Sequence, residues 1–519
     1  MKRRDFVKNG FLASVATPFI IKDLKFQALG KPLFSPEKSA EDKVLVIIKL
    51  GGGNDGLNTI IPMDQFDHLV IQRPNIILPK ANILSLNTNI GMHPSLTGLK
   101  SLFDDGKMSI IQNVGYPEQN RSHFRSTDIW NTGLMDPSAS TGWLGRNFDN
   151  HYPNFPADYP NNTYTDPFAI SIGSQVSATC QGLRGNFSHC VDNPNDTFNL
   201  AQNTVVNDGT YFGSHMEFLN TIIEQTNVYG AKVTAAINAV SDSNLSTFDT
   251  SNDIAVQLRY VAKMIKGGLK SKVYILNLDG FDTHDSQVSK TDVKLGNHSD
   301  LLKTVSDALK VFHDDLTTLN IDNRVAGMTY SEFGRQIASN ASLGTDHGDA
   351  APLFLFGTCV GQQIVGPNPV ISDQIVDQAG VPMQIDFRNV YASILKNWFE
   401  ISETDVQALF EHQVIFYNFL NGCAAGIEET ALSSTTSLLY PNPASSITTV
   451  RFDSNNEWVK VELIDFSGKT ISLIYDGNLV SQSHQISIDL SDVANGEYIV
   501  SIKKSSGYES LKLIKVKSL

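Results

Sequence analysis

The sequence predicts an α/β fold with a central, mostly parallel sheet flanked by helices, followed by a small C-terminal all-β sandwich. Two observations predict the sheet: continuous runs of β-branched residues end in glycine-rich or polar loops, and stretches with helical spacing lie between them. A third observation predicts the sandwich: after about Ser433 the chain consists of short segments in which apolar and polar residues alternate, separated by Ser-Gly and Asn-Gly turns.

The N-terminus has the layout of an export signal. A basic stretch precedes an apolar run from Gly10 to Ile21, which is too short to span a bilayer stably. The stretch Arg3–Lys8 is similar to the twin-arginine motif, whose pathway carries folded proteins. An ordinary secretory signal with a chance arginine pair is the alternative. We expect residues 1–30 to direct export, with the periplasm crossed in transit.

Charge and cysteine content agree with an exported protein. The 519 residues include 54 acidic and 40 basic side chains, and the net charge of −14 argues against a nucleic-acid-binding surface. No later segment is apolar enough to cross a membrane. Cys180 and Cys190 could close a small disulfide loop, while Cys359 and Cys423 could pair or stay free. Without a Cys-x-x-Cys motif, a thiolate metal site has no support.

The body of the chain repeats one pattern, a buried strand followed by polar residues. The strands are expected at residues 43–50, 272–278 and 324–330, and ligands of open α/β sheets bind at the carboxyl ends of strands. Helical spacing predicts helices within Ile254–Ile265, Leu301–Leu319 and Val390–Phe399. The stretch from Asn147 to about Ser243 is expected to be a loop-rich insertion and helical cover.

The expected strand ends supply carboxylates, an amide and imidazoles. The candidate metal ligands are Asn54, Asp55, Asp282, His284, Asp346 and His347. Asp346 and His347 offer an oxygen and an imidazole from one glycine-flanked turn, although an ordinary hydrogen-bonded turn is the alternative. The set could hold one or two divalent metals, with Zn, Mn, Ca or Mg as candidates.

Catalytic candidates cluster in Arg121–Arg125. Ser122 beside His123 could be a nucleophile near a metal, with Arg121 and Arg125 binding an anionic oxygen. The alternative is that the arginines pair with carboxylates and Ser122 caps a helix. Ser126 and Thr127 are rival nucleophiles. Glu332 and Arg335 could be a ligand and an anion clamp, or an ion pair that holds their loop.

The C-terminal segment resembles the sorting domain of the type IX secretion system found in Bacteroidetes. The matching motifs are Tyr440-Pro-Asn-Pro443, Asp465-Phe-Ser-Gly-Lys469, Gly496-Glu-Tyr-Ile-Val500 and Lys512-Leu-Ile-Lys-Val-Lys517. The resemblance implies that residues 438–519 engage this machinery after a linker at 426–437. It also implies release from the cell or attachment to its surface. A carbohydrate-binding or fibronectin-like sandwich is the alternative.

The body resembles the DUF1501 family. The motifs are Leu50-Gly-Gly-Gly-Asn-Asp-Gly-Leu-Asn-Thr59, Met92-His-Pro94, Arg121-Ser-His-Phe-Arg125, Gly142-Trp-Leu-Gly-Arg146, Gly280-Phe-Asp-Thr-His284, Ser331-Glu-Phe-Gly-Arg335, Gly344-Thr-Asp-His-Gly348 and Asp386-Phe-Arg-Asn-Val-Tyr391. They occur in the family's order, and we expect the domain at 40–425. The family is grouped with the alkaline phosphatase and sulfatase superfamily, which implies an alkaline phosphatase-like sheet and a metal-dependent hydrolase.

The resemblance also implies specific ligands. Superfamily members use an Asp after the first strand, a Ser or Thr nucleophile, an Asp-x-x-x-His pair, an Asp-His pair and a further His. Asp55 and the pair Asp346-His347 match this pattern. Asp282 and His284 are spaced as Asp-x-His instead, and no His follows His347 until His412. One metal rather than two, or a non-catalytic site, is therefore an alternative.

The favoured function is an exported, metal-dependent hydrolase of phosphate or sulfate esters. Its substrate would be a small anionic ester or a polysaccharide-derived compound, and the bound metal would activate a hydroxyl and stabilise the leaving oxygen. The alternative is a surface-exported, non-catalytic binding or assembly protein that keeps a degenerate metal site.

Overall fold

In the computed structural model, the described residues fall into two compact units, one within residues 1–424 and one within residues 425–519. The described residues are 43–192, 200, 208–242, 247–420, 437–465, 469–480, 482–505 and 507–517. The predicted export signal lies outside these residues, as does the predicted linker up to residue 436.

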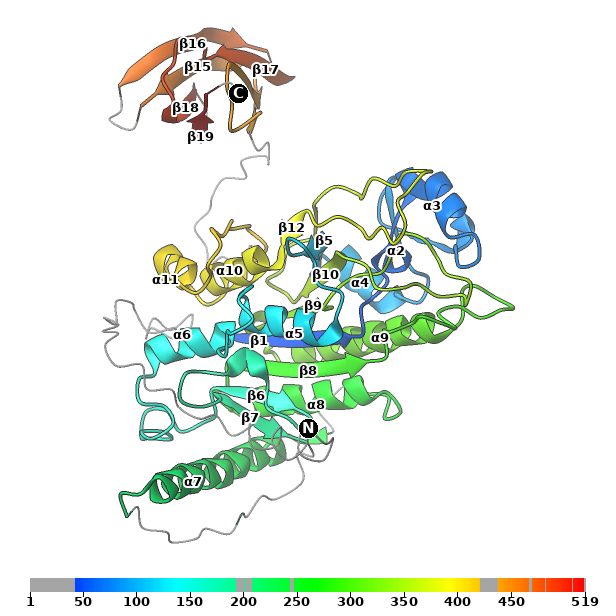
Figure 1. The fold of residues 1–519 in the computed structure, drawn as a ribbon, viewed down its shortest axis with the longest axis vertical. Coiled ribbons are helices and arrows are strands. Elements are labelled where there is room, and N and C mark those ends of the chain that lie inside the picture. Colours follow the sequence, from blue (N-terminus) through cyan, green and yellow to red (C-terminus); the bar gives the residue numbers. More distant parts are fainter. Residues whose placement is uncertain are drawn as a thin grey trace, which may run out of the picture. The chain divides into compact units, whose positions relative to one another are not determined.

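A mixed, mostly parallel sheet forms the centre of the first unit, as predicted. Its order is β11-β5-β10-β9-β1-β8-β6-β7, and β12 also pairs with β5 (Figure 1). The bounds are β1 Val44–Gly51, β5 Met108–Gly115, β6 Ala169–Ile172, β7 Ser188–Val191, β8 Val273–Asp279, β9 Val325–Tyr330, β10 Ala351–Phe356, β11 Gln363–Val365 and β12 Ile385–Asp386. The strands β9, β1, β8, β6 and β7 run parallel, whereas β10 is antiparallel to both of its neighbours.

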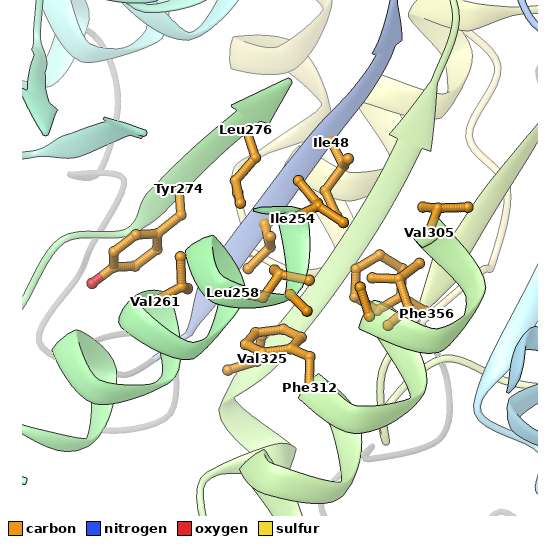
Figure 2. Close-up of a cluster of buried hydrophobic side chains, with 14 of the residues drawn as sticks. Ile48, Ile254, Leu258, Val261, Tyr274, Leu276, Val305, Phe312, Val325 and Phe356 are labelled. Carbon is orange, nitrogen blue, oxygen red and sulfur yellow. The ribbon is translucent and has the colours of Figure 1, made fainter. Parts of the chain in front are cut away.

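The strand β1 is apolar at nearly every position, with Lys49 as the exception, because both faces of the sheet are covered. Val46 and Ile48 pack into one core cluster, while Leu45 and Ile47 pack into another on the opposite face. Figure 2 shows the first cluster, in which side chains of β1, β8, β9 and β10 meet those of α8 and α9.

Helices are confirmed at all three predicted places, as α8 (Asp253–Lys266), α9 (Asn297–Thr318) and α10 (Phe387–Asn397). The predicted ranges run one residue past the end of α9 and two residues past the end of α10. The helices α8 and α9 cover one face of the sheet. Side chains of α5 (His123–Thr132), α6 (Trp143–His151) and α10 pack into the cluster on the other face.

The segment predicted as a loop-rich insertion with helical cover contains more regular structure than the sequence indicates. It contains the 28-residue helix α7 (Tyr211–Asn238) and also the strands β6 and β7, which extend the parallel sheet at its edge. Each of these strands has four residues, too few for a clear periodic signal.

The prediction of a Cys180–Cys190 disulfide is wrong, because both cysteines are free. Cys180 lies in the core with 0% of its surface exposed, whereas Cys190 donates from Sγ to the carbonyl of Gly173 at 2.6 Å. Burial raises the pKa of the Cys180 thiol. Cys359 is disulfide-bonded.

Shorter elements complete the first unit. They are α2 Gly56–Thr59, β2 Ile60–Pro62, η1 Met63–Gln65, α3 Phe66–Gln72, η2 Lys80–Asn82, β3 Leu84–Ser85, β4 Ile90–Met92, α4 Thr97–Asp104, η3 Ala178–Cys180, η5 Asp322–Arg324 and α11 Glu403–Gln407. Strands β2, β4 and β3 form a small separate sheet. Within the described ranges, no helix is long and apolar enough to cross a membrane.

The second unit is the predicted all-β region. Its two antiparallel sheets have the orders β13-β14-β17 and β16-β15-β18-β19. The bounds are β13 Leu438–Tyr440, β14 Ile447–Ser454, β15 Glu457–Ile464, β16 Thr470–Leu479, β17 Gln482–Asp489, β18 Gly496–Lys504 and β19 Gly507–Lys515. Alternating side chains of both sheets, such as Val450, Phe452, Val459 and Val461, form one buried cluster.

Candidate metal centre

The centre lies where the carboxyl ends of β9, β1 and β8 come together. These three strands are neighbours in the parallel sheet, so the polar loops that follow them meet at one edge. The loop after β1 must pass very close to the loop after β8. Gly52 has φ +120°, and a Cβ there would lie 2.3 Å from the backbone nitrogen of Asp282. Glycine is therefore required at this position.

Three histidines and one aspartate converge at this edge. The Nε2 atoms of His284 and His347 are 2.9 Å apart, and each lies 3.1 Å from Oδ1 of Asp282. Nε2 of His123 approaches the other oxygen of Asp282 at 3.4 Å. We call these four residues the histidine–aspartate centre. It joins α5 to the loops that follow β8 and β9.

The hydrogen bond made by Nδ1 of each imidazole ring fixes which tautomer is present. Nδ1 of His347 donates to the backbone carbonyl of Arg121 at 2.9 Å, and Nδ1 of His284 donates to Asp346 at 2.8 Å. Nδ1 of His123 donates to Glu332 at 2.9 Å. A carbonyl or carboxylate can only accept, so each neutral ring carries its proton on Nδ1. The Nε2 lone pairs of all three rings therefore face Asp282.

This arrangement fits a divalent metal. Two imidazole lone pairs 2.9 Å apart repel each other unless a proton or a cation lies between them. Imidazole nitrogens with a carboxylate oxygen are typical zinc ligands, and such histidines characteristically donate their second ring nitrogen to a carboxylate or carbonyl. The ligand atoms of His123, Asp282 and His347 all lie within 4.8 Å of one another. These three residues could together hold one metal ion.

The charge states at neutral pH suit metal binding. Burial alone would raise the pKa of Asp282, but the hydrogen bond from Arg335 and the charge of its guanidinium outweigh burial, and the pKa lies at about 2. Burial lowers the pKa of His347 below its ordinary value. Asp282 is therefore a carboxylate, and His347 is a neutral imidazole with a free lone pair.

The predicted anion-binding arginines are engaged by the protein itself. Arg335 is buried and donates to Asp282 at 2.7 Å and to the backbone carbonyls of Gly52, Gly53, Phe281 and Thr345. Arg121 forms a two-point pair with Asp349, with both N–O distances 2.9 Å. Arg125 donates to the carbonyl of Met135 at 2.6 Å. These contacts hold loops in place.

The candidate hydroxyls also differ in their surroundings. Ser122 is the exposed N-cap of α5, and its side chain makes no capping hydrogen bond. Ser126 is buried, donates to the backbone carbonyl of Glu332 and accepts from Tyr116 at 2.8 Å. Thr127 accepts from Lys49 at 2.8 Å. Of the three, Ser122 alone is exposed.

The structure places Asn54 and Asp55 in a separate buried network beside the centre. Asp55 accepts from Nη1 of Arg73 at 2.9 and 2.7 Å and from Gln287 at 2.6 Å. Oδ1 of Asn54 lies 2.9 Å from Nε2 of His298. Sequence reasoning missed Arg73, Gln287 and His298, because none of them lies in a motif or directly after a predicted strand.

Two family models match the sequence. Residues 77–410 match the one described as "Protein of unknown function (DUF1501)", and residues 438–517 match the one described as "Secretion system C-terminal sorting domain". No curated protein sequence matches the chain.

Several solved structures are distantly similar. A protein in the alkaline phosphatase superfamily from Vibrio parahaemolyticus is 7% identical, with a TM-score of 0.36 over 95% of this chain and 93% of that one. Phosphonate monoester hydrolase from Silicibacter pomeroyi is 8% identical, with a TM-score of 0.31 over 91% and 89%. Alkaline phosphatase from the Antarctic bacterium TAB5 is 9% identical, with a TM-score of 0.26 over 71% and 98%.

Proposed function

Because the chain belongs to the DUF1501 family and ends in a secretion-system sorting domain, we propose that it is an exported metal-dependent hydrolase with one divalent metal at the histidine–aspartate centre. The observation that carries the proposal is the convergence of three imidazole lone pairs on one carboxylate at the carboxyl edge of the sheet.

The side chains divide into those that would hold the metal and those that orient the ligands. Asp282 and the three histidines would hold it, while Asp346, Glu332 and the carbonyl of Arg121 fix the rings. Arg335 fixes the Asp282 carboxylate. A metal bound here would lower the pKa of a coordinated water and stabilise charge on a leaving oxygen.

The centre is accessible from solvent. The side chains of Asp282 and His284 are 45% and 44% exposed, so a substrate can reach the metal ligands from outside. Ser122, exposed beside His123, stays the proposed hydroxyl for attacking or positioning an ester.

Phosphate or sulfate esters are the substrate class we propose, on the basis of the sequence resemblance. Arg121, Arg125 and Arg335 each donate to protein acceptors, so the metal would supply most of the positive charge that an anionic substrate meets. The same occupied arginines favour the second candidate function, a surface protein that binds metal without catalysis.

A screen of the full chain separates the two candidates. Aryl phosphates, aryl sulfates and a neutral aryl carboxylate would be offered to the zinc-loaded protein, the chelator-treated protein and the Asp282→Asn variant. A hydrolase should release the aryl alcohol only when the metal and Asp282 are both present. One bound metal without turnover of any ester would favour the binding protein.

Acidification should release the metal. Burial lowers the pKa of His347 below its ordinary value, so this ring is neutral at pH 7, and protons compete with a metal for its Nε2 only in more acidic solution. Asp282 stays ionised throughout, because its pKa is about 2. We expect zinc affinity to fall at least about tenfold between about pH 7.5 and about pH 5. Titrations in matched buffers measure this, and a constant affinity would contradict imidazole ligation.

The export route is proposed in two stages. The sorting domain at residues 438–517 engages the type IX secretion machinery. We propose that residues 1–30 first direct the chain to the periplasm, and that the product then reaches the cell surface or the medium.

A further inference from the structure

We propose that the guanidinium of Arg73 occupies the cation position at Asp55, so that the centre binds one metal and the Asp55–Arg73 pair positions the loops that carry its ligands. This inference rests on the proposed metal centre and concerns how many metals the chain binds and what aligns the ligands. Asp55 follows β1 at the same sheet edge as the centre, where the sequence predicts a metal ligand.

Asp55 already has a full set of partners. Its side chain is 0% exposed and that of Arg73 is 2% exposed, and Nη1 of Arg73 lies 2.9 and 2.7 Å from the two carboxylate oxygens. Gln287 donates to Oδ2 at 2.6 Å. A divalent ion at Asp55 would have to displace a guanidinium that is buried away from solvent, which leaves its charge uncompensated.

Arg73 also holds the loop that leads to His347. Its Nε donates to the carbonyl of Ile337 at 2.6 Å and its Nη2 donates to the carbonyl of Gln336 at 2.6 Å. The backbone N–H of Gln336 in turn donates to the carbonyl of Asp346 at 2.9 Å. Two hydrogen bonds therefore connect the guanidinium to Asp346, which orients His284 and directly precedes His347.

Gln287 extends the network to the other ligand loop. Its Oε1 accepts from the hydroxyl of Thr345 at 2.7 Å and from that of Thr283 at 3.3 Å. Thr283 lies between Asp282 and His284, and Thr345 directly precedes Asp346. One buried network thus connects Asp55 to both loops of the centre.

The test is a set of variants titrated with Zn²⁺ after chelator treatment of the full chain. The variants are Asp55→Asn, Arg73→Met and the double Asp55→Asn/Arg73→Met. Each single change leaves a buried polar group unpaired and should lower the unfolding midpoint. The double variant should regain part of that stability, because it leaves no unpaired buried charge.

The zinc affinity should separate a positioning role from a merely structural one. We expect the double variant to bind zinc about 10- to 100-fold more weakly than the wild type despite its recovered stability, because the contacts with residues 336 and 337 are lost. The matched control is Asp386→Asn/Arg388→Met. That pair is also buried, and Arg388 donates to the two oxygens of Asp386 at 2.6 and 2.8 Å. Because it lies at β12 and the start of α10, its loss should leave zinc affinity unchanged.

Each outcome bears on one proposal or the other. A wild type that binds two equivalents of zinc, or a double variant with wild-type affinity, would overturn this inference and leave the hydrolase proposal standing. One tight equivalent with the expected variant pattern but no ester turnover would support the inference and overturn the hydrolase. A wild type that binds no zinc would overturn both.

Discussion

Replacing His284 or His347 with alanine is expected to weaken zinc binding by more than about 100-fold and to abolish any ester hydrolysis. Each change removes one of two Nε2 atoms that lie 3.1 Å from Asp282 and 2.9 Å from each other. Loss of a group that only orients a ligand costs about 10- to 100-fold, and loss of the ligand itself should exceed that range. Zinc titration of each purified variant measures the effect.

Two further variants sharpen this experiment. Asp346→Ala removes the acceptor of His284 Nδ1 but no Nε2 atom, and it should fall in the range of about 10- to 100-fold. His68→Ala is the matched control, because His68 is 41% exposed and also contacts an aspartate, yet it lies in α3. If His284→Ala bound zinc no more weakly than His68→Ala does, the centre would be wrongly assigned.

The largest expected effect on stability is that of Arg335→Met. The guanidinium is 0% exposed and satisfies four backbone carbonyls as well as Asp282, so its removal leaves buried acceptors without donors. Asp282 is 45% exposed, so the cost comes mainly from the buried carbonyls. Each buried acceptor left without a donor costs about 1–3 kcal/mol, and the loss of several should cost at least about 3 kcal/mol. We expect the free energy of unfolding of the first unit to fall by that amount, measured by urea denaturation.

Comparison with Arg121→Met shows how much of the stability loss in Arg335→Met depends on the burial of the arginine. Arg121 also makes a two-point pair with an aspartate, Asp349, but the two side chains are 29% and 26% exposed. Solvent can replace part of what the substitution removes, so its cost should be about 1 kcal/mol or less. Equal losses for the two variants would show that Arg335 does not hold the loops as its contacts indicate.

Much of the sheet could be predicted because its central strands are covered on both faces. The run at β1 is apolar at nearly every position, and the polar loops after β1, β8 and β9 mark the edge where ligands bind. The same logic singled out Asp282, His284 and His347, which the fold brings within hydrogen-bonding distance of one another. Polar residues directly after buried strands therefore mark the candidate ligands in this sequence.

The roles within the site could not be read from local sequence. His123 stands next to Ser122 in the chain, but its position opposite Asp282 depends on how α5 packs near the loop after β8. The pairing of Asp55 with Arg73 spans 18 residues, and that with Gln287 spans 232. No spacing rule covers such contacts, because they depend on three loops meeting at one edge. The four-residue strands β6 and β7 were missed for a local reason, their length.

The most direct test of the metal centre is anomalous diffraction at the zinc edge from crystals of the full chain grown with zinc. We expect one peak at the histidine–aspartate centre, bounded by Asp282, His123, His284 and His347, and none beside Asp55. A peak beside Asp55, or no peak at the histidine–aspartate centre, would contradict the account.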